Sequence, residues 1–131
     1  MLHLEKMSTF ENGEVLKRYR ISEPYTVIDC LKAMIRNPDV ALGHGEREGD
    51  HDVGFDSDSD HDYYSSVQEF LESVDYERYN PRFNVYNSYY FFYGTYKGKT
   101  INVSFSYGNG ITLCCSDRQI DLCAMIDEAS C

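Results

Sequence analysis

The sequence has no tryptophan, only three prolines, and twelve lysines and arginines against twenty-two aspartates and glutamates. This shortage of cations argues against non-specific binding to nucleic acid or to an anionic membrane, because both surfaces are negatively charged. No stretch reaches the roughly eighteen apolar residues that a membrane-spanning helix needs. The polar N-terminal stretch lacks the apolar core of a signal peptide, so we expect a cytoplasmic protein.

The motifs of common enzyme classes are also missing. The sequence contains no G-x-S-x-G, P-loop, G-x-G-x-x-G or H-E-x-x-H pattern. Its five cysteines include no C-x-x-C, and their odd number favours a reduced protein with free thiols. Cys114 and Cys115 have no neighbouring histidine to lower a thiol pKa, so we expect them to pack in the core. We therefore expect a protein that is not an enzyme.

What the sequence does contain is one strongly negative segment. Residues 39–78 carry thirteen carboxylates and two arginines, whereas the rest of the chain carries nine carboxylates and ten cations. The net charge of −10 therefore belongs to this segment, and such a concentrated field selects cationic partners. A solvated linker is the alternative interpretation. The candidate partner-binding residues are Asp50, Asp52, Asp56, Asp58, Asp60, Asp62, Glu69, Glu72, Asp75, Tyr63 and Tyr64.

The first half of the chain predicts a hairpin, a helix and a loop. Residues 1–21 alternate apolar and polar residues around Asn12-Gly13, which is typical of a β-hairpin. Residues 24–36 have helical spacing, with Ser22 or Thr26 as the cap. Residues 39–64 are rich in Gly and Asp, so we expect a long acidic loop, inserted into a single domain that spans residues 1–131.

The second half predicts an acidic helix, three strands and a last helix. Residues 65–77 indicate a helix, because Ser66 and Glu69 have the spacing of a capping box and the apolar residues form one stripe. Residues 83–115 read as a three-stranded antiparallel meander joined by glycine turns. A C-terminal helix is expected from its cap, Ser116, onward. This order of elements belongs to the α+β class.

Two further patterns leave alternatives open. Lys17, Arg18 and Arg20 could bind a phosphate, or could form a charged strand that faces solvent or the chain's own acids. The aromatic run from Tyr86 to Tyr96 could be a stacking platform for bases, but few cations lie near it in the sequence. Packing in the sheet, or contact with a protein partner, fits this run better.

A metal site is a further alternative. Asp58, Asp60, Asp62 and Glu69 have the spacing of EF-hand positions 1, 3, 5 and 12, which would make the protein a Ca²⁺-responsive module. Tyr63 stands where the EF-hand loop needs glycine, and no helix clearly precedes the pattern. His44, His51 and His61 lie among the acids and could be metal ligands or simply exposed histidines.

In its acidic charge and its expected architecture, the chain resembles the small phage-encoded inhibitors of defence nucleases, which include anti-CRISPR proteins and anti-restriction DNA mimics. The resemblance rests on residues 39–77 and 83–127 and on no alignable motif. It implies a protein without a cofactor that binds the basic nucleic-acid groove of an RNA-guided or restriction nuclease and blocks DNA binding. An immunity protein for a toxin or effector is the alternative function, because it uses the same electrostatics on another target.

Overall fold

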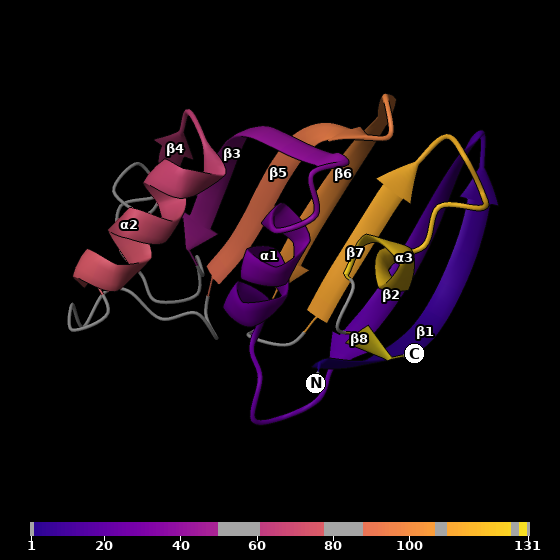
Figure 1. Ribbon diagram of the computed structural model, residues 1–131, viewed down its shortest axis with the longest axis horizontal. Helices are drawn as coiled ribbons and strands as arrows, with labels where there is room; N and C mark the ends of the chain where they lie inside the picture. The colour runs from indigo at the N-terminus through magenta and orange to yellow at the C-terminus, as the bar shows by residue number, and fades with distance from the viewer. Residues whose placement is uncertain (1, 50–60, 78–87, 107–109, 127–128, 131) are drawn as a thin grey trace.

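The computed structural model describes residues 2–49, 61–77, 88–106, 110–126 and 129–130. In these residues the chain forms one eight-stranded sheet with three helices (Figure 1). The strand order is β4-β3-β5-β6-β7-β2-β1-β8, antiparallel except between β1 and β8. The elements are β1 Leu2–Asn12, β2 Glu14–Ile21, α1 Val27–Ile35, β3 Val40–Gly49, β4 His61–Tyr64, α2 Val67–Glu77, β5 Ser88–Tyr96, β6 Lys99–Ser106, β7 Gly110–Cys115, α3 Leu122–Met125 and β8 Ala129–Ser130.

The predicted N-terminal hairpin is confirmed. β1 and β2 pair antiparallel around Gly13, whose φ of 76° needs a glycine. Along β2 the burial alternates, with Val15, Lys17, Tyr19 and Ile21 turned to the helix side. The local period of two was enough to predict this strand and its faces.

The predicted α+β class with a three-stranded meander is wrong. The meander β5–β6–β7 exists, but it is the centre of a much larger sheet. β2 pairs with β7 on one side and β3 pairs with β5 on the other. Pairing between strands far apart in sequence is set by packing on both faces, and the sequence pattern of a single strand does not reveal it.

The prediction of a long loop over residues 39–64 is also wrong for the two parts of this range that the structure describes. Residues 40–49 form β3 and residues 61–64 form β4, and these two strands pair with each other. Glycines in β3 suggested a loop, but Gly45 is required there. A Cβ on Gly45 would lie 2.3 Å from the ring of Phe92. The glycine thus lets an aromatic ring of β5 lie against the β3 backbone.

Helix caps explain where two of the helices begin. α1 starts after Thr26, whose backbone N–H donates to the Asp29 carboxylate at 2.8 Å. α2 starts after Ser66, whose hydroxyl accepts a hydrogen bond from the Glu69 N–H at 3.1 Å. The expected helix over 65–77 is therefore confirmed, with its start at Val67.

The expected C-terminal helix is much shorter than predicted. It is the single turn α3, and its cap is Asp121 rather than Ser116. The carbonyls of Arg118 and Ile120, which precede it, accept hydrogen bonds from the buried ammonium of Lys17 at 2.8 and 2.5 Å. These carbonyls are bound to a side chain of β2, which favours an irregular segment over a helix.

The hydrophobic core lies between the helices and one face of the sheet. Phe70 of α2 is fully buried, with its ring centroid 4.9–5.1 Å from those of Tyr64, Tyr90 and Phe92 in edge-to-face geometry. Leu31 and Met34 of α1 and Met125 of α3 belong to the same cluster. The helices therefore cover one face, and no described helix covers the other face of the sheet (Figure 1).

Candidate binding face

We call the sheet face opposite the helices the open face. Strand registers bring one residue from each of seven strands into a single row across it. Tyr63 pairs with Glu46, and Glu46 pairs with Phe91. Phe91 continues through Ser104 and Thr112 to Arg18. The complete row is Tyr63, Glu46, Phe91, Ser104, Thr112, Arg18 and Ser8. Its chemistry changes from aromatic and acidic, through hydroxyl groups, to basic.

The β4-β3-β5 end of the open face is aromatic and acidic. Tyr63 is 69% exposed, although a tyrosine has enough apolar surface to be buried. Tyr89, Phe91 and Tyr93 alternate with the buried residues of β5 and are half-buried. The ring of His44 stacks on that of Tyr93, with centroids 4.9 Å apart. We call Tyr63, Glu46, Phe91 and Tyr93 the aromatic–acidic patch.

The centre of the open face is polar. Asn102, Ser104, Ser106 and Thr112 are half-buried on β6 and β7. The side-chain oxygen of Asn102 is buried and accepts no hydrogen bond from any described residue. This floor therefore offers hydroxyl and amide groups that could be shared with a bound molecule.

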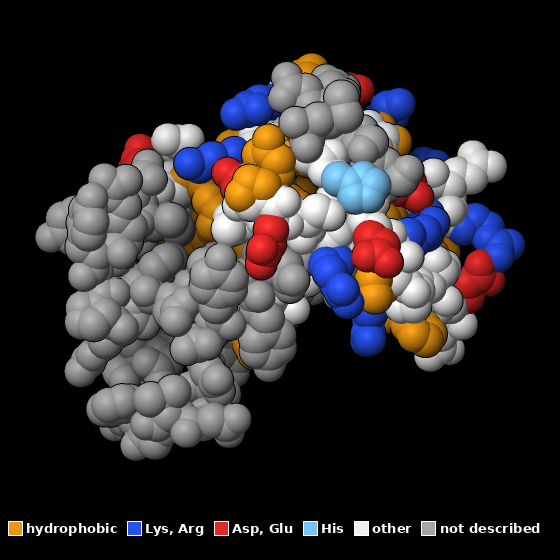
Figure 2. Space-filling model, turned by 90° about the horizontal axis from the view of Figure 1, so that it is seen from below, with side chains coloured by type: hydrophobic (Ala, Val, Ile, Leu, Met, Phe, Trp, Pro, Cys, Tyr) orange, Lys and Arg blue, Asp and Glu red, His pale blue; other side chains and the backbone are white. Residues whose placement is uncertain are grey.

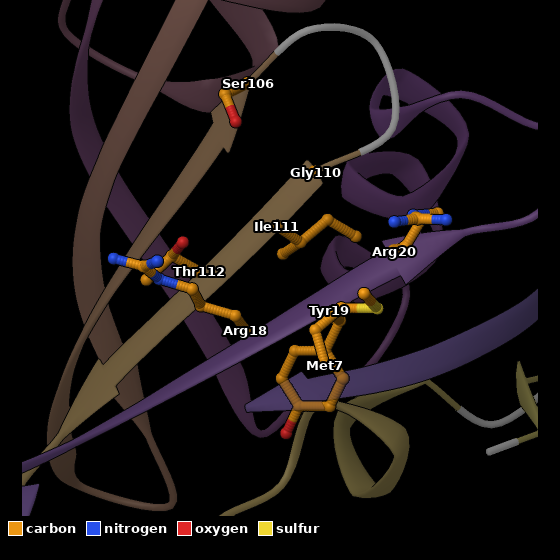
Figure 3. Close-up of a pocket in the computed structure, with 8 residues that line it drawn as sticks. All are labelled: Met7, Arg18, Tyr19, Arg20, Ser106, Gly110, Ile111 and Thr112. Atoms are coloured by element: carbon orange, nitrogen blue, oxygen red, sulfur yellow. The ribbon is translucent and has the colours of Figure 1, made fainter. Parts of the chain in front are cut away.

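The β2 end of the open face is basic and hollowed. A depression of about 400 Å³ is lined by Met7, Arg18, Tyr19, Arg20, Ser106, Gly110, Ile111 and Thr112 (Figure 3). Arg18 lies opposite Thr112 and Arg20 opposite Gly110. We call this the arginine pocket. In Figure 2 the lower edge of the molecule is hollowed, and Lys and Arg side chains border the hollow on the right, where Figure 1 places β1 and β2.

The basic cluster seen in the sequence is therefore divided between two faces. Arg18 and Arg20 are exposed on the open face, whereas Lys17 is 5% exposed beneath the segment before α3. Tyr19, Lys17 and Lys6 all approach Asp121: the Tyr19 hydroxyl donates to its carboxylate at 3.0 Å and Lys6 at 3.2 Å, while Lys17 lies 4.0 Å away. This partly buried cluster fixes α3 to β2.

The pKa shifts in this cluster follow from burial and hydrogen bonding. Burial, opposed in part by the hydrogen bond from the Leu122 N–H, raises the pKa of the Tyr19 phenol well above its ordinary value. Burial also acts on Asp121, but hydrogen bonds from the Cys123 N–H, Tyr19 and Lys6 outweigh it and lower the pKa of that carboxyl. Each group is held in its ordinary charge state, which suits a structural role.

The predicted partner-binding residues are distributed over several places. Tyr63 lies on the open face, whereas Tyr64 is buried against Phe70 in the core. Glu69 and Glu72 are exposed on α2, in the helix layer. Asp62 lies in β4 and Asp75 in α2, while five of the predicted residues lie outside the described residues: Asp50, Asp52, Asp56, Asp58 and Asp60.

The predicted acids that the structure describes share one end of the molecule. β3, β4 and α2, which carry them, all lie at the left end of the sheet in Figure 1. Hydrogen bonds from the Ser65 hydroxyl and backbone N–H lower the pKa of Glu69, so its carboxylate stays charged. We call the described part of this region, β3, β4 and α2, the acidic end.

The EF-hand alternative does not fit the described half of its pattern. Residues 61–64 are an extended strand paired with β3, which cannot wrap around an ion as a calcium loop does. The Glu69 carboxylate instead accepts hydrogen bonds from Ser65. Among the residues described, no group of three or more His, Cys, Asp and Glu side chains could hold a metal ion.

The cysteines differ in their surroundings. Cys30 and Cys115 are buried free thiols, and burial raises the pKa of Cys30 to about 12. Cys114 was expected in the core but is half-buried on the open face, where its thiol donates to Glu14 at 3.0 Å. Cys123 is in a disulfide, so the expectation of free thiols fails there.

Comparison with protein-family models, curated proteins and solved structures found no match. In the described part of the chain, no helix is long and apolar enough to cross a membrane. The site must therefore be interpreted from its own chemistry.

Proposed function

We propose that this protein is a non-catalytic inhibitor that binds the basic nucleic-acid groove of a nuclease, of the RNA-guided or the restriction type, and prevents DNA from entering. The single observation that carries the proposal is the coincidence of charge and exposed aromatic surface at one end. The described parts of the segment that holds the net charge form the acidic end, and Tyr63, which follows Asp62 in the sequence, is exposed there.

The charge provides attraction over distance. A strongly negative end raises the rate of encounter with a cationic groove and disfavours uncharged partners. Glu46 on β3 and Glu69 and Glu72 on α2 extend this field on both sides of the sheet edge. Because the carboxylates belong to paired strands and a capped helix, they present the charge in a fixed arrangement.

The aromatic side chains provide contact. Tyr and Phe at the centre of an interface contribute most of its affinity, and arginine side chains of a partner can stack on their faces. In the cross-strand row, Glu46 stands between Tyr63 and Phe91, so one arginine could bind a carboxylate and an aromatic ring together. The aromatic–acidic patch thus combines the two groups that a nucleic-acid groove recognises in DNA, an anion and a flat ring.

The test is a cleavage assay with a purified RNA-guided nuclease and a restriction endonuclease. We expect stoichiometric inhibition of one of them, weaker when the protein is added after DNA and weaker at high salt. Tyr63→Ala should raise the inhibitory concentration about tenfold or more, the effect expected of an interface hot spot. Glu46→Gln should raise it less, and mainly at low salt.

Matched controls lie outside the acidic end. Tyr25→Ala and Glu23→Gln remove an exposed tyrosine and an exposed acid just before α1, and should leave inhibition unchanged. Failure to inhibit either nuclease at a large excess of protein would refute the proposal. So would inhibition that is equally insensitive to changes at Tyr63 and at Tyr25.

A further inference from the structure

We infer that the arginine pocket binds a phosphate monoester, a ligand independent of the nuclease partner proposed above. Arg18 in this pocket is three strands away from Phe91 along the cross-strand row, towards the other end of the open face. Its volume of about 400 Å³ falls in the range of small-molecule sites.

Its charge is the first argument. Arg18 and Arg20 are two residues apart on one strand face, so their Cα atoms are about 6.6 Å apart. Figure 3 shows their guanidinium groups at opposite ends of the pocket, so a ligand between them would draw both side chains inwards. Neither has a carboxylate within 4 Å among the described residues, although the protein is acidic overall. By contrast, Arg118 and Lys99 pair with Glu11 and Asp117. Glu5 of β1 lies opposite Arg20 in the strand register and offsets part of this charge. Two guanidinium groups without a direct ion pair among the described residues still face the two charges of a phosphate monoester.

The geometry of the donors is the second argument. A guanidinium presents parallel N–H groups that fit two oxygens of one phosphate. The guanidinium carbon of Arg18 lies 5.3 Å from the centre of the Phe10 ring, which restricts the side chain without using its N–H groups. Thr112 and Ser106 add hydroxyl groups on the pocket floor, and Figure 3 shows Arg18 beside Thr112.

Gly110 keeps the pocket open. A Cβ at this position would lie 2.9 Å from the Ser106 hydroxyl and 3.1 Å from the Ser106 carbonyl oxygen. A side chain would therefore cover the Ser106 hydroxyl and fill the space opposite Arg20. The glycine leaves room for a ligand at the point where the strand floor meets the arginine.

Binding can be measured on the purified full chain by calorimetry or by NMR titration at low ionic strength. The probes are inorganic phosphate, ribose 5-phosphate, AMP and an oligothymidylate that has phosphodiesters but no terminal phosphate. We expect the first three to bind, with chemical-shift changes centred on β2 and β7. Tighter binding of AMP than of inorganic phosphate would identify a nucleotide as the ligand; equal binding would limit recognition to the phosphate group.

Arg18→Gln and Arg20→Gln should each weaken phosphate binding about tenfold or more, as expected for the loss of a charged hydrogen-bond donor. Thr112→Val keeps the side-chain shape and should weaken binding less. Arg36→Gln removes an exposed arginine at the end of α1 and is the matched control. Binding that is equal in Arg18→Gln and Arg36→Gln would overturn the inference, as would an oligothymidylate that binds more tightly than AMP. Neither result depends on any nuclease.

Discussion

Replacing Lys17 by methionine tests how the chain is held together near α3. The Lys17 ammonium is buried and donates hydrogen bonds to the carbonyls of Arg118 and Ile120. Methionine retains the unbranched stem, so the change removes the charge and the donors while the packing is largely kept. The two carbonyls then lose their partner, and Asp121 loses a nearby cation.

The expected cost can be worked out from these contacts. A buried acceptor left without a donor costs about 1–3 kcal/mol, and two acceptors are affected here. Some of this is recovered because the buried ammonium no longer has to be desolvated. We therefore expect the free energy of unfolding to fall by about 3 kcal/mol, a large share of the roughly 5–15 kcal/mol typical of a domain.

Urea denaturation followed by circular dichroism measures this change. With a slope of about 2 kcal/mol per molar, the midpoint should fall by about 1.5 M. Lys99→Met is the control, because the Lys99–Asp117 pair is exposed and its loss should leave the midpoint unchanged. A Lys17→Met midpoint within about 0.3 M of wild type, or a fall equal to that of Lys99→Met, would refute the structural role of Lys17.

Three further predictions follow from individual contacts. Because the folded state lowers the pKa of the Asp121 carboxyl, this group stabilises the fold at pH values above the ordinary Asp pKa of about 4. That stability is lost as pH falls through the lower folded-state pKa. The urea midpoint should therefore drop below pH 4 in wild type, and drop less in Asp121→Asn. A Cβ at Gly94 would lie 2.1 Å from the Ala41 carbonyl oxygen, so Gly94→Ala should push β3 from β5 and lower Tm by about 5–10 °C in calorimetry, whereas an unchanged Tm would contradict the close approach. Burial and the hydrogen bond to Glu14 raise the pKa of Cys114 to about 11. Iodoacetamide at pH 8 should therefore react with Cys114 on the order of a hundredfold more slowly than with an ordinary thiol, and the reaction should be faster in Glu14→Gln. A wild-type rate like that of a free thiol would count against this contact.

Local patterns in the sequence predicted what depends on neighbours in the chain. The alternation along residues 14–21 and 100–107 indicated strands, and Ser66–Glu69 indicated the start of α2. The same alternation already placed Arg18 and Arg20 on the face opposite Lys17. That separation, together with the basic cluster itself, was the signal in the sequence that pointed to the arginine pocket.

Contacts between distant residues account for what was missed. β3 is rich in Gly and Glu, and its pairing with β5 overrides that composition. The residues before α3 are bound by Lys17, more than a hundred positions earlier, so a helical pattern there did not become a helix. The pocket combines β1, β2, β6 and β7, whose order in the sheet follows no simple rule of sequence.

The central claim is that the acidic end and its exposed Tyr63 bind a cationic nucleic-acid groove. The most direct measurement is the dissociation constant for a purified nuclease at about 0.05 and 0.5 M salt, in wild type and in Tyr63→Ala. We predict that wild-type affinity falls steeply with salt, that Tyr63→Ala weakens binding at both concentrations, and that bound protein and DNA exclude each other. An affinity that is independent of salt, or a complex that holds protein and DNA together on the groove, would contradict the account.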